Sequence, residues 1–356
     1  MTGKTEDFQR FSIDALAAFA ERSLAAAGLT PEAAAAGGRL IVEPDLNGAD
    51  GHGIFRLAQY ARRIVAGGIN TRPNIRIARE SAAMAVIDGD NGLGHLVVER
   101  AARAAMDMAE VNGVGWAGVR HGNHAGAAST YARMPMERGM IGLYIAVGSA
   151  NHLPPWGGID MLLSTNPIAI AVPAMEEPPI VLDMATTVAA YGKVKTALQR
   201  GEMMPEGWMI DREGKPLTDP KRADEGFLLP IGGYKGYGLS LMFGILAGTL
   251  NGAAAGADVV DFNKDQTTPS NTGQAILAMK IDAFWESTDA FRRKIDEVVR
   301  SMRNSAKMPG VDRIRLPGEV SYAKRQDRLE NGVPLPPQLL EGLRALATEL
   351  DIEGPA

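Results

Sequence analysis

The hydrophobic positions at the start of the chain follow a helical period. Four apolar residues recur at three- and four-residue spacing, namely Leu16, Phe19, Ala20 and Leu24. Ser12 precedes this run as a capping residue and Gly28 ends it. Thr30 followed by Pro31 is a second helix start, because proline is favoured in the first turn. The N-terminal region is therefore predicted to form a pair of helices.

From residue 82 onward, short apolar runs alternate with helical patterns. Runs of strand length occur at 83–87, 116–119, 141–147, 168–172, 179–182 and 275–281. Helical patterns lie among them, at 96–110, at 127–137, after Thr186 and at 236–250. This alternation indicates an α/β protein whose sheet is flanked by helices.

The most apolar stretch runs from Leu239 to Leu250 and contains Gly244 and Gly248. A helix needs about 20 apolar residues to cross a bilayer, so this stretch is too short. We therefore expect a buried helix here and no membrane partner. The N-terminal segment is polar and lacks the apolar core of a secretory signal, which predicts a cytoplasmic protein.

The C-terminal region returns to helical patterns, near 288–305 and 337–350. Helical ends around a strand-rich middle predict that both termini fold together as one helical layer on a sheet. We expect a helical domain formed by residues 1–75 with 286–356, and a sheet domain formed by residues 76–285.

Composition narrows the classes of function. The 356-residue chain has 37 basic and 42 acidic residues, which argues against a nucleic-acid partner because such proteins usually carry a clustered basic excess. No cysteine is present, which excludes disulfides, cysteine-ligated zinc, iron–sulfur clusters and a thiol nucleophile. The 41 glycines exceed the usual share and indicate tight turns or close backbone approaches to a ligand.

The first candidate for chemistry is His52, which lies between Gly51 and Gly53 with Arg56 four residues later. On a helix, the imidazole and the guanidinium would share one face. A guanidinium offers a two-pronged contact to a carboxylate, beside a group that can transfer a proton. The same pattern also fits a turn histidine beside a surface arginine.

The second candidate is His124, in a polar, glycine-broken segment that follows the run 116–119 and opens a helix. Such junctions often bind ligands in α/β proteins. His121 and His124 could instead form a metal pair in a hydrolase, with His152 or Asp183 as a third ligand. No HExxH motif or cysteine cluster supports a metal.

The sequence contains one dinucleotide motif in the wrong structural context and two other segments that could contact a nucleotide. Residues 113–118 match GxGxxG, but a helical pattern precedes them and a strand follows, the reverse of the dinucleotide fingerprint. Lys235, in the glycine-rich segment 232–238 at a helix start, would suit a phosphate, although a solvated lysine in a turn also fits. Asp183 ends an apolar run and could cap a helix, orient a histidine or bind a ribose hydroxyl.

Taken together and in order, these segments resemble the type-2 malate/L-lactate dehydrogenase family, which includes ureidoglycolate and sulfolactate dehydrogenases, diketogulonate reductase and piperideine/pyrroline-2-carboxylate reductase. The matching pieces are 50–56 with Tyr60, 88–94, 123–126, 155–158, 165–167, 182–186, 235–239 and 316–319. Each piece alone is weak, but the ordered set spans nearly the whole chain.

The resemblance implies a nicotinamide-binding fold that is not a Rossmann domain, with a mostly antiparallel or mixed sheet flanked by helices. It also implies a homodimer, with NAD or NADP and substrate in a cleft near the subunit contact. The implied reaction is reversible hydride transfer between NAD(P)H and a 2-keto acid or cyclic 2-imino acid. A nucleotide-binding protein without catalysis is the remaining alternative.

The resemblance also assigns residues. It implies that His52 or His124 contacts the substrate and transfers the proton, and that Arg56 holds the substrate carboxylate. The positions that match cofactor contacts are Ser149, Asn166, Asp183, Met184, Ala185 and Lys235, and Asp183 is sometimes given a relay role.

The sequence departs from the family at two positions of this site. Gly51 stands where the family usually has serine, which removes the first member of a serine–histidine–aspartate relay. We therefore expect His124 to transfer the proton, with His52 as a second donor. Ala125 replaces a usual aromatic residue, which implies a roomier pocket and leaves the specific substrate open.

Overall fold

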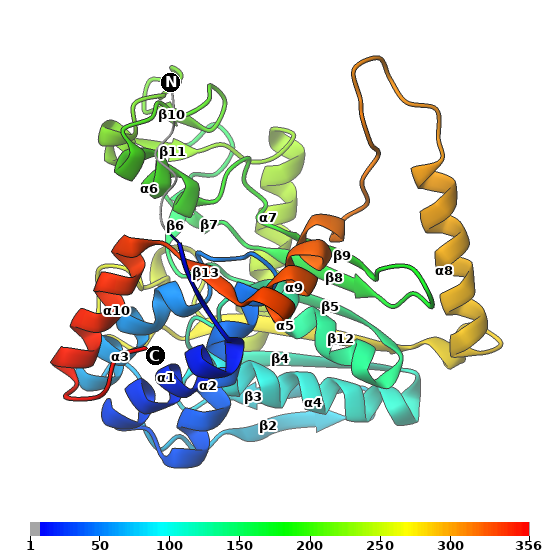
Figure 1. The fold of residues 1–356 in the computed structure, drawn as a ribbon, viewed down its shortest axis with the longest axis horizontal. Coiled ribbons are helices and arrows are strands. Elements are labelled where there is room, and N and C mark those ends of the chain that lie inside the picture. Colours follow the sequence, from blue (N-terminus) through cyan, green and yellow to red (C-terminus); the bar gives the residue numbers. More distant parts are fainter. Residues whose placement is uncertain (1–7, 356) are drawn as a thin grey trace.

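The computed structural model describes residues 8–355 (Figure 1). At its centre lies a seven-stranded sheet with the order β2-β3-β4-β12-β5-β8-β9. The strands are β2 (Arg76–Ser81), β3 (Met84–Asp88), β4 (Val114–Gly122), β12 (Thr272–Lys280), β5 (Met140–Ala146), β8 (Ile168–Val172) and β9 (Ile180–Met184). Only the β3–β4 pair is parallel among these neighbours. The predicted mixed, mostly antiparallel sheet is confirmed.

Helices cover both faces of this sheet, as the alternation of side chains along β5 shows. Tyr144 and Ala146 face a core shared with α4 (Gly94–Asn112) and α5 (Ala128–Arg133), which continues as the 3-10 turn η2 (Met134–Arg138). Ile145 points the other way, toward α7 (Tyr234–Ala247). Successive strand residues point to opposite faces, so one strand contributes to two cores.

A separate helical layer packs beside the sheet and contains segments from both ends of the chain (Figure 1). Its members are α1 (Ile13–Ala26), α2 (Pro31–Leu46), α3 (Leu57–Val65) and α10 (Pro337–Glu349). Ser12 and Thr30 cap α1 and α2 through their side chains, as the sequence predicts. The strand pair β1 (Gln9–Phe11) and β13 (Val333–Leu335) joins the two ends. The division at residues 75 and 286 stays a prediction.

Smaller elements complete the fold. The remaining strands form two pairs, β6 (Asn151–Leu153) with β7 (Leu163–Ser164) and β10 (Met209–Asp211) with β11 (Gly226–Leu228). The pair β10–β11 shares a small core with α6 (Tyr191–Arg200) and η3 (Pro220–Glu225). The other short turns are η1 (Ile54–Arg56), η4 (Thr249–Asn251), η5 (Gly256–Asp258) and η6 (Ile281–Ala283).

The apolar helix α7 forms where predicted, but the expectation that it is buried is wrong. Its buried residues are the small ones, Gly236, Ser240, Gly244 and Ala247, which recur every three or four positions and let the helix approach the sheet closely. Several of its large residues, including Leu239 and Met242, are exposed, whereas Phe243 is half-buried against the sheet. The apolar pattern of α7 therefore marks a helix surface that no other described part of this chain fully covers. No helix within the described residues is long and apolar enough to span a membrane.

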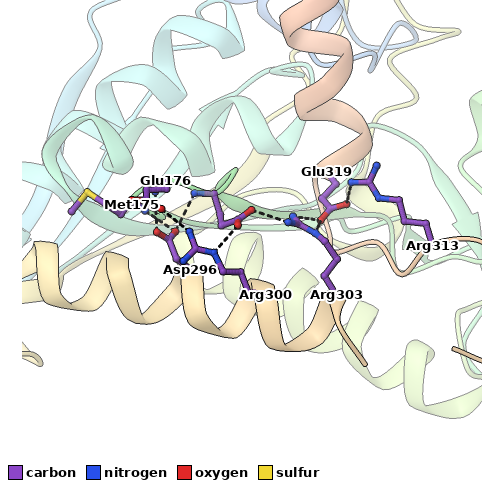
Figure 2. A network of polar contacts seen from close by, with 8 residues as sticks. Met175, Glu176, Asp296, Arg300, Arg303, Arg313 and Glu319 are labelled. Carbon is purple, nitrogen blue, oxygen red and sulfur yellow. Dashed lines mark hydrogen bonds and ion pairs between the residues drawn. The ribbon is translucent and has the colours of Figure 1, made fainter. Parts of the chain in front are cut away.

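Polar contacts rather than an apolar core hold α8 (Thr288–Arg303) against the β8–β9 loop, and Figure 2 shows these contacts. Asp296 accepts hydrogen bonds from the backbone N–H groups of Met175, Glu176 and Glu177 at 3.0, 3.0 and 3.1 Å. Burial would raise the pKa of Asp296, but these three donors hold it below its usual value.

The same network reaches the start of α9 (Glu319–Asn331). Arg303 pairs with Glu177 at 2.9 Å and with Glu319 at 2.8 Å, and Arg313 pairs with Glu319 at 3.1 Å. Just before Glu319, the carbonyl of Pro317 accepts a hydrogen bond from Val181 of β9 at 3.1 Å. The network thus fixes the segment that enters α9 beside the edge of the sheet.

We predict that Asp296→Ala lowers the free energy of unfolding by about 3 kcal/mol, because three backbone donors lose one charged acceptor. The matched control is Glu297→Ala, since Glu297 pairs with Lys294 alone among the described residues and both side chains are more than half exposed. That control should cost less than about 0.5 kcal/mol. Urea unfolding at one protein concentration measures both changes, and equal losses would contradict the role given to Asp296.

Candidate active site

A cavity of about 520 Å³ opens where the helical layer meets one edge of the central sheet. Its walls come from the α2–α3 connection, the segments that follow β4, β5 and β9, the first turns of α6, and the segment that enters α9. This size falls within the range of small-molecule and cofactor sites. The cavity is therefore the candidate active site.

Arg56 points into this cavity and is held by neutral oxygens alone. Its Nε donates to the carbonyl of Gly51 at 3.1 Å, and its Nη1 donates to Gln59 Oε1 at 2.8 Å and to Asn263 Oδ1 at 3.2 Å. Within the part of the chain that the structure describes, no carboxylate lies within ion-pair distance of this guanidinium. Burial lowers its pKa. A half-buried positive charge without an acid partner favours binding of an anion from outside.

The turn that carries His52 and Arg56 is anchored by Asp45 of α2. Asp45 accepts a hydrogen bond from the Ile54 N–H at 2.7 Å. Gly53 allows this close approach, because a Cβ at that position would lie 2.2 Å from the Asp45 carboxyl. Burial raises the pKa of Asp45 to about 8, against the opposing effect of the Ile54 hydrogen bond. Asp45 is thus an uncharged acceptor near neutral pH.

His124 is held in one tautomer. Its Nδ1 lies 2.5 Å from the Tyr60 hydroxyl and 3.4 Å from the Gly126 backbone nitrogen. A backbone N–H can only donate, so Nδ1 is the acceptor and the neutral ring carries its proton on Nε2. The ring also stacks on Phe262 at a centroid distance of 5.1 Å. Nε2 is therefore left for the substrate.

His52 and His124 lie close together, with ring centroids 6.3 Å apart. Burial lowers the pKa of both imidazoles, and the positive charge of Arg56 lowers each further. Asp183 opposes this shift at His52. Without a bound anion both rings are neutral at neutral pH, and an anion beside Arg56 would raise their pKa values.

The structure brings most of the predicted site residues to the cavity. Its lining includes Arg56, His52, His124, Ser149, Asp183, Met184 and Ala185. Asp183 accepts a hydrogen bond from the Ser129 backbone at 2.9 Å and has no hydrogen bond to either histidine among the described residues. It thus anchors the start of α5 while it faces the cavity.

Two predicted cofactor contacts lie outside this lining. Asn166 is buried, accepts a hydrogen bond from the Gly148 backbone at 3.1 Å and donates to the Ser240 carbonyl at 2.8 Å, so it ties α7 to the sheet. Lys235 is exposed in the first turn of α7.

The two histidines of the alternative metal-pair hypothesis are not brought together in one site. His121 lies outside the cavity lining and bonds through Nδ1 to Asp88 at 2.9 Å, whereas His124 bonds to Tyr60 inside it. Over residues 8–355, no three His, Cys, Asp or Glu side chains are placed to share a metal ion. His152 lines the cavity but stacks on Tyr191, with ring centroids 4.3 Å apart.

Sequence reasoning missed several groups at this site. Tyr60 appeared only as one piece of a family pattern, although its position four residues after Arg56 on a helical stretch could have placed it on the same face. Asn263 and Lys195 carried no signal, because they come from distant segments that only the tertiary fold brings to Arg56.

We predict that Asp45→Asn makes the protein less sensitive to alkaline pH. Asp45 has a folded-state pKa of about 8 against an ordinary aspartate pKa of 3.8, so its contribution to stability is complete below the lower value and is lost as pH rises through the upper one. Asparagine keeps an oxygen for Ile54 but cannot ionise.

Thermal unfolding between pH values of about 5 and about 9 measures the effect. The stability of the variant relative to wild type should increase by at least about 2 kcal/mol across this range. A relative stability that does not change with pH would show that Asp45 is already ionised in the folded protein.

Comparisons with known proteins agree with this geometry. The sequence model of the malate/L-lactate dehydrogenase family matches residues 11–344. Malate dehydrogenase from Pyrococcus horikoshii is 37% identical, with 98% of each chain covered. Its solved structure has a TM-score of 0.88 and covers 99% of each chain at 35% identity.

Two further relatives carry other names. L-sulfolactate dehydrogenase from Methanocaldococcus jannaschii is 36% identical over 98% of this chain and 97% of that protein. Ureidoglycolate dehydrogenase (NAD(+)) from Escherichia coli K12 is 32% identical over 92% of each. The predicted family and the predicted class of enzyme, a dehydrogenase or reductase, are confirmed. The chain belongs to the malate/L-lactate dehydrogenase family.

Proposed function

We propose that this protein interconverts a 2-keto acid and the corresponding 2-hydroxy acid, or a cyclic 2-imino acid and the amino acid, with NAD or NADP as the redox partner. The observation that carries the proposal is the half-buried guanidinium of Arg56, held by neutral oxygens beside two imidazoles in the cavity. The malate and sulfolactate dehydrogenases among the relatives are named for 2-hydroxy acids, which supports the same class of substrate here.

In this proposal Arg56 binds the carboxylate next to the keto group, through the part of its guanidinium that Gly51, Gln59 and Asn263 leave free. A fixed carboxylate restricts the orientation of the keto carbon. Reduction places negative charge on the keto oxygen, and His124 donates a proton to it from Nε2. His52, whose ring centre lies 6.3 Å from that of His124, is the second donor.

The lowered pKa of His124 before substrate binds suits this role. Burial and Arg56 keep the ring neutral until an anion binds. The substrate carboxylate then offsets the charge of Arg56 and raises the pKa of the ring, so that protonation follows substrate binding. In the oxidative direction Nε2 accepts the proton of the hydroxyl group, and the ring's own proton then sits on Nδ1, where the Tyr60 oxygen accepts it.

The lining of the cavity fits a nicotinamide cofactor. Small residues leave room for ring systems, among them Ala146, Gly148, Ala150, Ala185 and Gly318. The buried Nε of Arg133, which also lines the cavity, has no hydrogen-bond partner among the described residues, so a phosphate oxygen would satisfy it. When bound, the cofactor supplies or accepts the hydride. Ureidoglycolate dehydrogenase carries NAD(+) in its name, which supports this class of cofactor.

We assign cofactor contacts to Ser149, Asp183, Met184 and Ala185, which face the cavity. Asn166 and Lys235 lie outside its lining, so their contribution rests on the family resemblance alone. Asn166 would act by holding the backbone of Gly148 at the cavity wall.

We predict that His124→Ala lowers kcat for 2-keto acid reduction by at least about a hundredfold, because the keto oxygen loses its proton donor. Binding of NADH or NADPH, measured by fluorescence, should stay near the wild-type value. His121→Ala is the matched control, since His121 lies outside the cavity. Initial rates with a panel of 2-keto acids test the assignment, and unchanged turnover in the His124 variant would refute it.

We also propose a homodimer in which α7 contributes to the subunit contact. Large apolar side chains gather on its exposed surface, including Leu239, Leu241, Met242 and Ile245, with Leu250 just beyond its end. Contiguous exposed apolar surface of this kind is typical of protein interfaces. The resemblance to the family supports a second copy of this chain as the partner.

We predict that Met242→Glu with Ile245→Glu shifts the protein from dimer to monomer, because two charges would be buried at the contact. Light scattering coupled to size exclusion measures the mass of each form. Met302→Glu on α8 is the control, since Met302 is also exposed but lies on another helix. A monomeric wild type, or a double variant that remains dimeric, would contradict the proposal.

A further inference from the structure

A second cation lies beside Arg56 in the cavity. Lys195 of α6 donates from Nζ to Asn263 Oδ1 at 3.3 Å, and Arg56 Nη1 donates to the same oxygen at 3.2 Å. Both side chains line the cavity. One amide oxygen thus bridges two positive charges that belong to different parts of the chain.

The orientation of that amide is fixed by Asp261. Asp261 Oδ1 accepts hydrogen bonds from the backbone nitrogen and the Nδ2 of Asn263, at 2.9 and 3.2 Å. The Asn263 amide nitrogen therefore donates to the Asp261 carboxylate, so the amide oxygen faces the two cations. Asp261 Oδ1 accepts both of these hydrogen bonds from Asn263, and Asp261 forms no ion pair with Lys195 within the described residues.

Among the described residues, protein groups accept only one of the hydrogen bonds that the Lys195 ammonium group can donate. Its ammonium group has three donors, and Asn263 is its one hydrogen-bond partner among the described side chains and backbone. Burial lowers the pKa of Lys195, and the charge of Arg56 lowers it further. Two neighbouring cations that share one neutral oxygen repel each other, so additional negative charge at this place would be bound favourably.

The fold holds Lys195 in place from the helix side. Tyr191 stands one turn earlier on α6 and stacks on His152, with rings 11° from parallel, while the Lys195 Nζ lies 5.8 Å from the Tyr191 ring centre. Residues four apart on a helix share one face, so this stack fixes the side of α6 that faces the cavity.

We infer that Lys195 binds a second anionic group of the substrate, a carboxylate or sulfonate on the carbon next to the keto carbon, while Arg56 holds the first carboxylate. The inference rests on the proposed function and narrows its substrate to short dianionic 2-keto acids. The chain between the two anionic groups must be short, because both cations contact the same oxygen atom.

The test compares Lys195→Met with wild type on paired substrates. Oxaloacetate and 3-sulfopyruvate carry the second anion, whereas pyruvate and 2-ketobutyrate do not. Lys195 is half-buried, so loss of its charge should lower the affinity for the second anion by about tenfold or more. We expect a decrease of that size in kcat/KM for the two dianions, mostly through KM, and less than about a threefold change for the two monoanions.

Two control variants sharpen the comparison. Lys193→Met changes a lysine on the same helix that is exposed and outside the cavity lining, and it should leave all four substrates unaffected. Lys195→Arg keeps the charge and should retain the preference for dianions. Thermal unfolding of each variant shows whether it is folded.

The possible failures are distinguishable. Equal losses on dianions and monoanions would overturn the inference, because Lys195 would then share the first carboxylate or only support the fold. A wild type that prefers pyruvate or 2-ketobutyrate would also overturn it, while the proposed function stands. No turnover of any 2-keto acid with either NADH or NADPH would refute the proposed function and this inference together.

Discussion

The site depends on one half-buried positive charge that no acidic side chain among the described residues neutralises. Arg56 is satisfied by three neutral oxygens, and its charge lowers the pKa values of two imidazoles and one ammonium group around it. After burial itself, Arg56 is the largest cause of the lowered pKa values of His52, His124 and Lys195. A cavity in which all these groups are pushed toward neutrality gains most when an anion arrives.

The short helix α3 and the turn before it hold the Arg56 side chain and the groups around it in place. Gln59 donates to the Phe262 carbonyl at 2.8 Å and accepts from Arg56, while Tyr60 contacts His124. On the next turn, buried Arg63 donates to the Thr268 carbonyl at 2.8 Å and to Ser270 Oγ at 3.1 Å. One helix therefore fixes the carboxylate binder, the proton donor and the loop that carries Asn263.

Local signals predicted the parts of the fold that depend on local physics. The caps Ser12 and Thr30 and the apolar runs of β3, β5 and β8 needed no tertiary information. Edge strand β2 was missed because its sequence, RIARES, is largely polar and exposed. The apolar run of α7 was misjudged as buried, since hydrophobicity predicts that a surface will be covered but not whether the same chain covers it.

At the site, the order of motifs led to His52, Arg56 and His124, and all three face one cavity. Asn166 shows the limit of motif reasoning, because its side chain serves the packing of α7. Lys195 and Asn263 could not be found from the sequence. They are linked to the site because the Asn263 amide oxygen contacts both Lys195 and Arg56, and Arg56 lies more than a hundred residues away along the chain.

The central claim is that Arg56 and burial hold the proton-transfer imidazole neutral until substrate binds. The most direct measurement is kcat/KM for 2-keto acid reduction as a function of pH, since it reports the protonation of the protein before the keto acid binds. We expect the rate constant to fall as pH rises, with an apparent pKa below the ordinary histidine value of 6.5. A profile that is flat through that region, or that falls only above 6.5, would contradict the account.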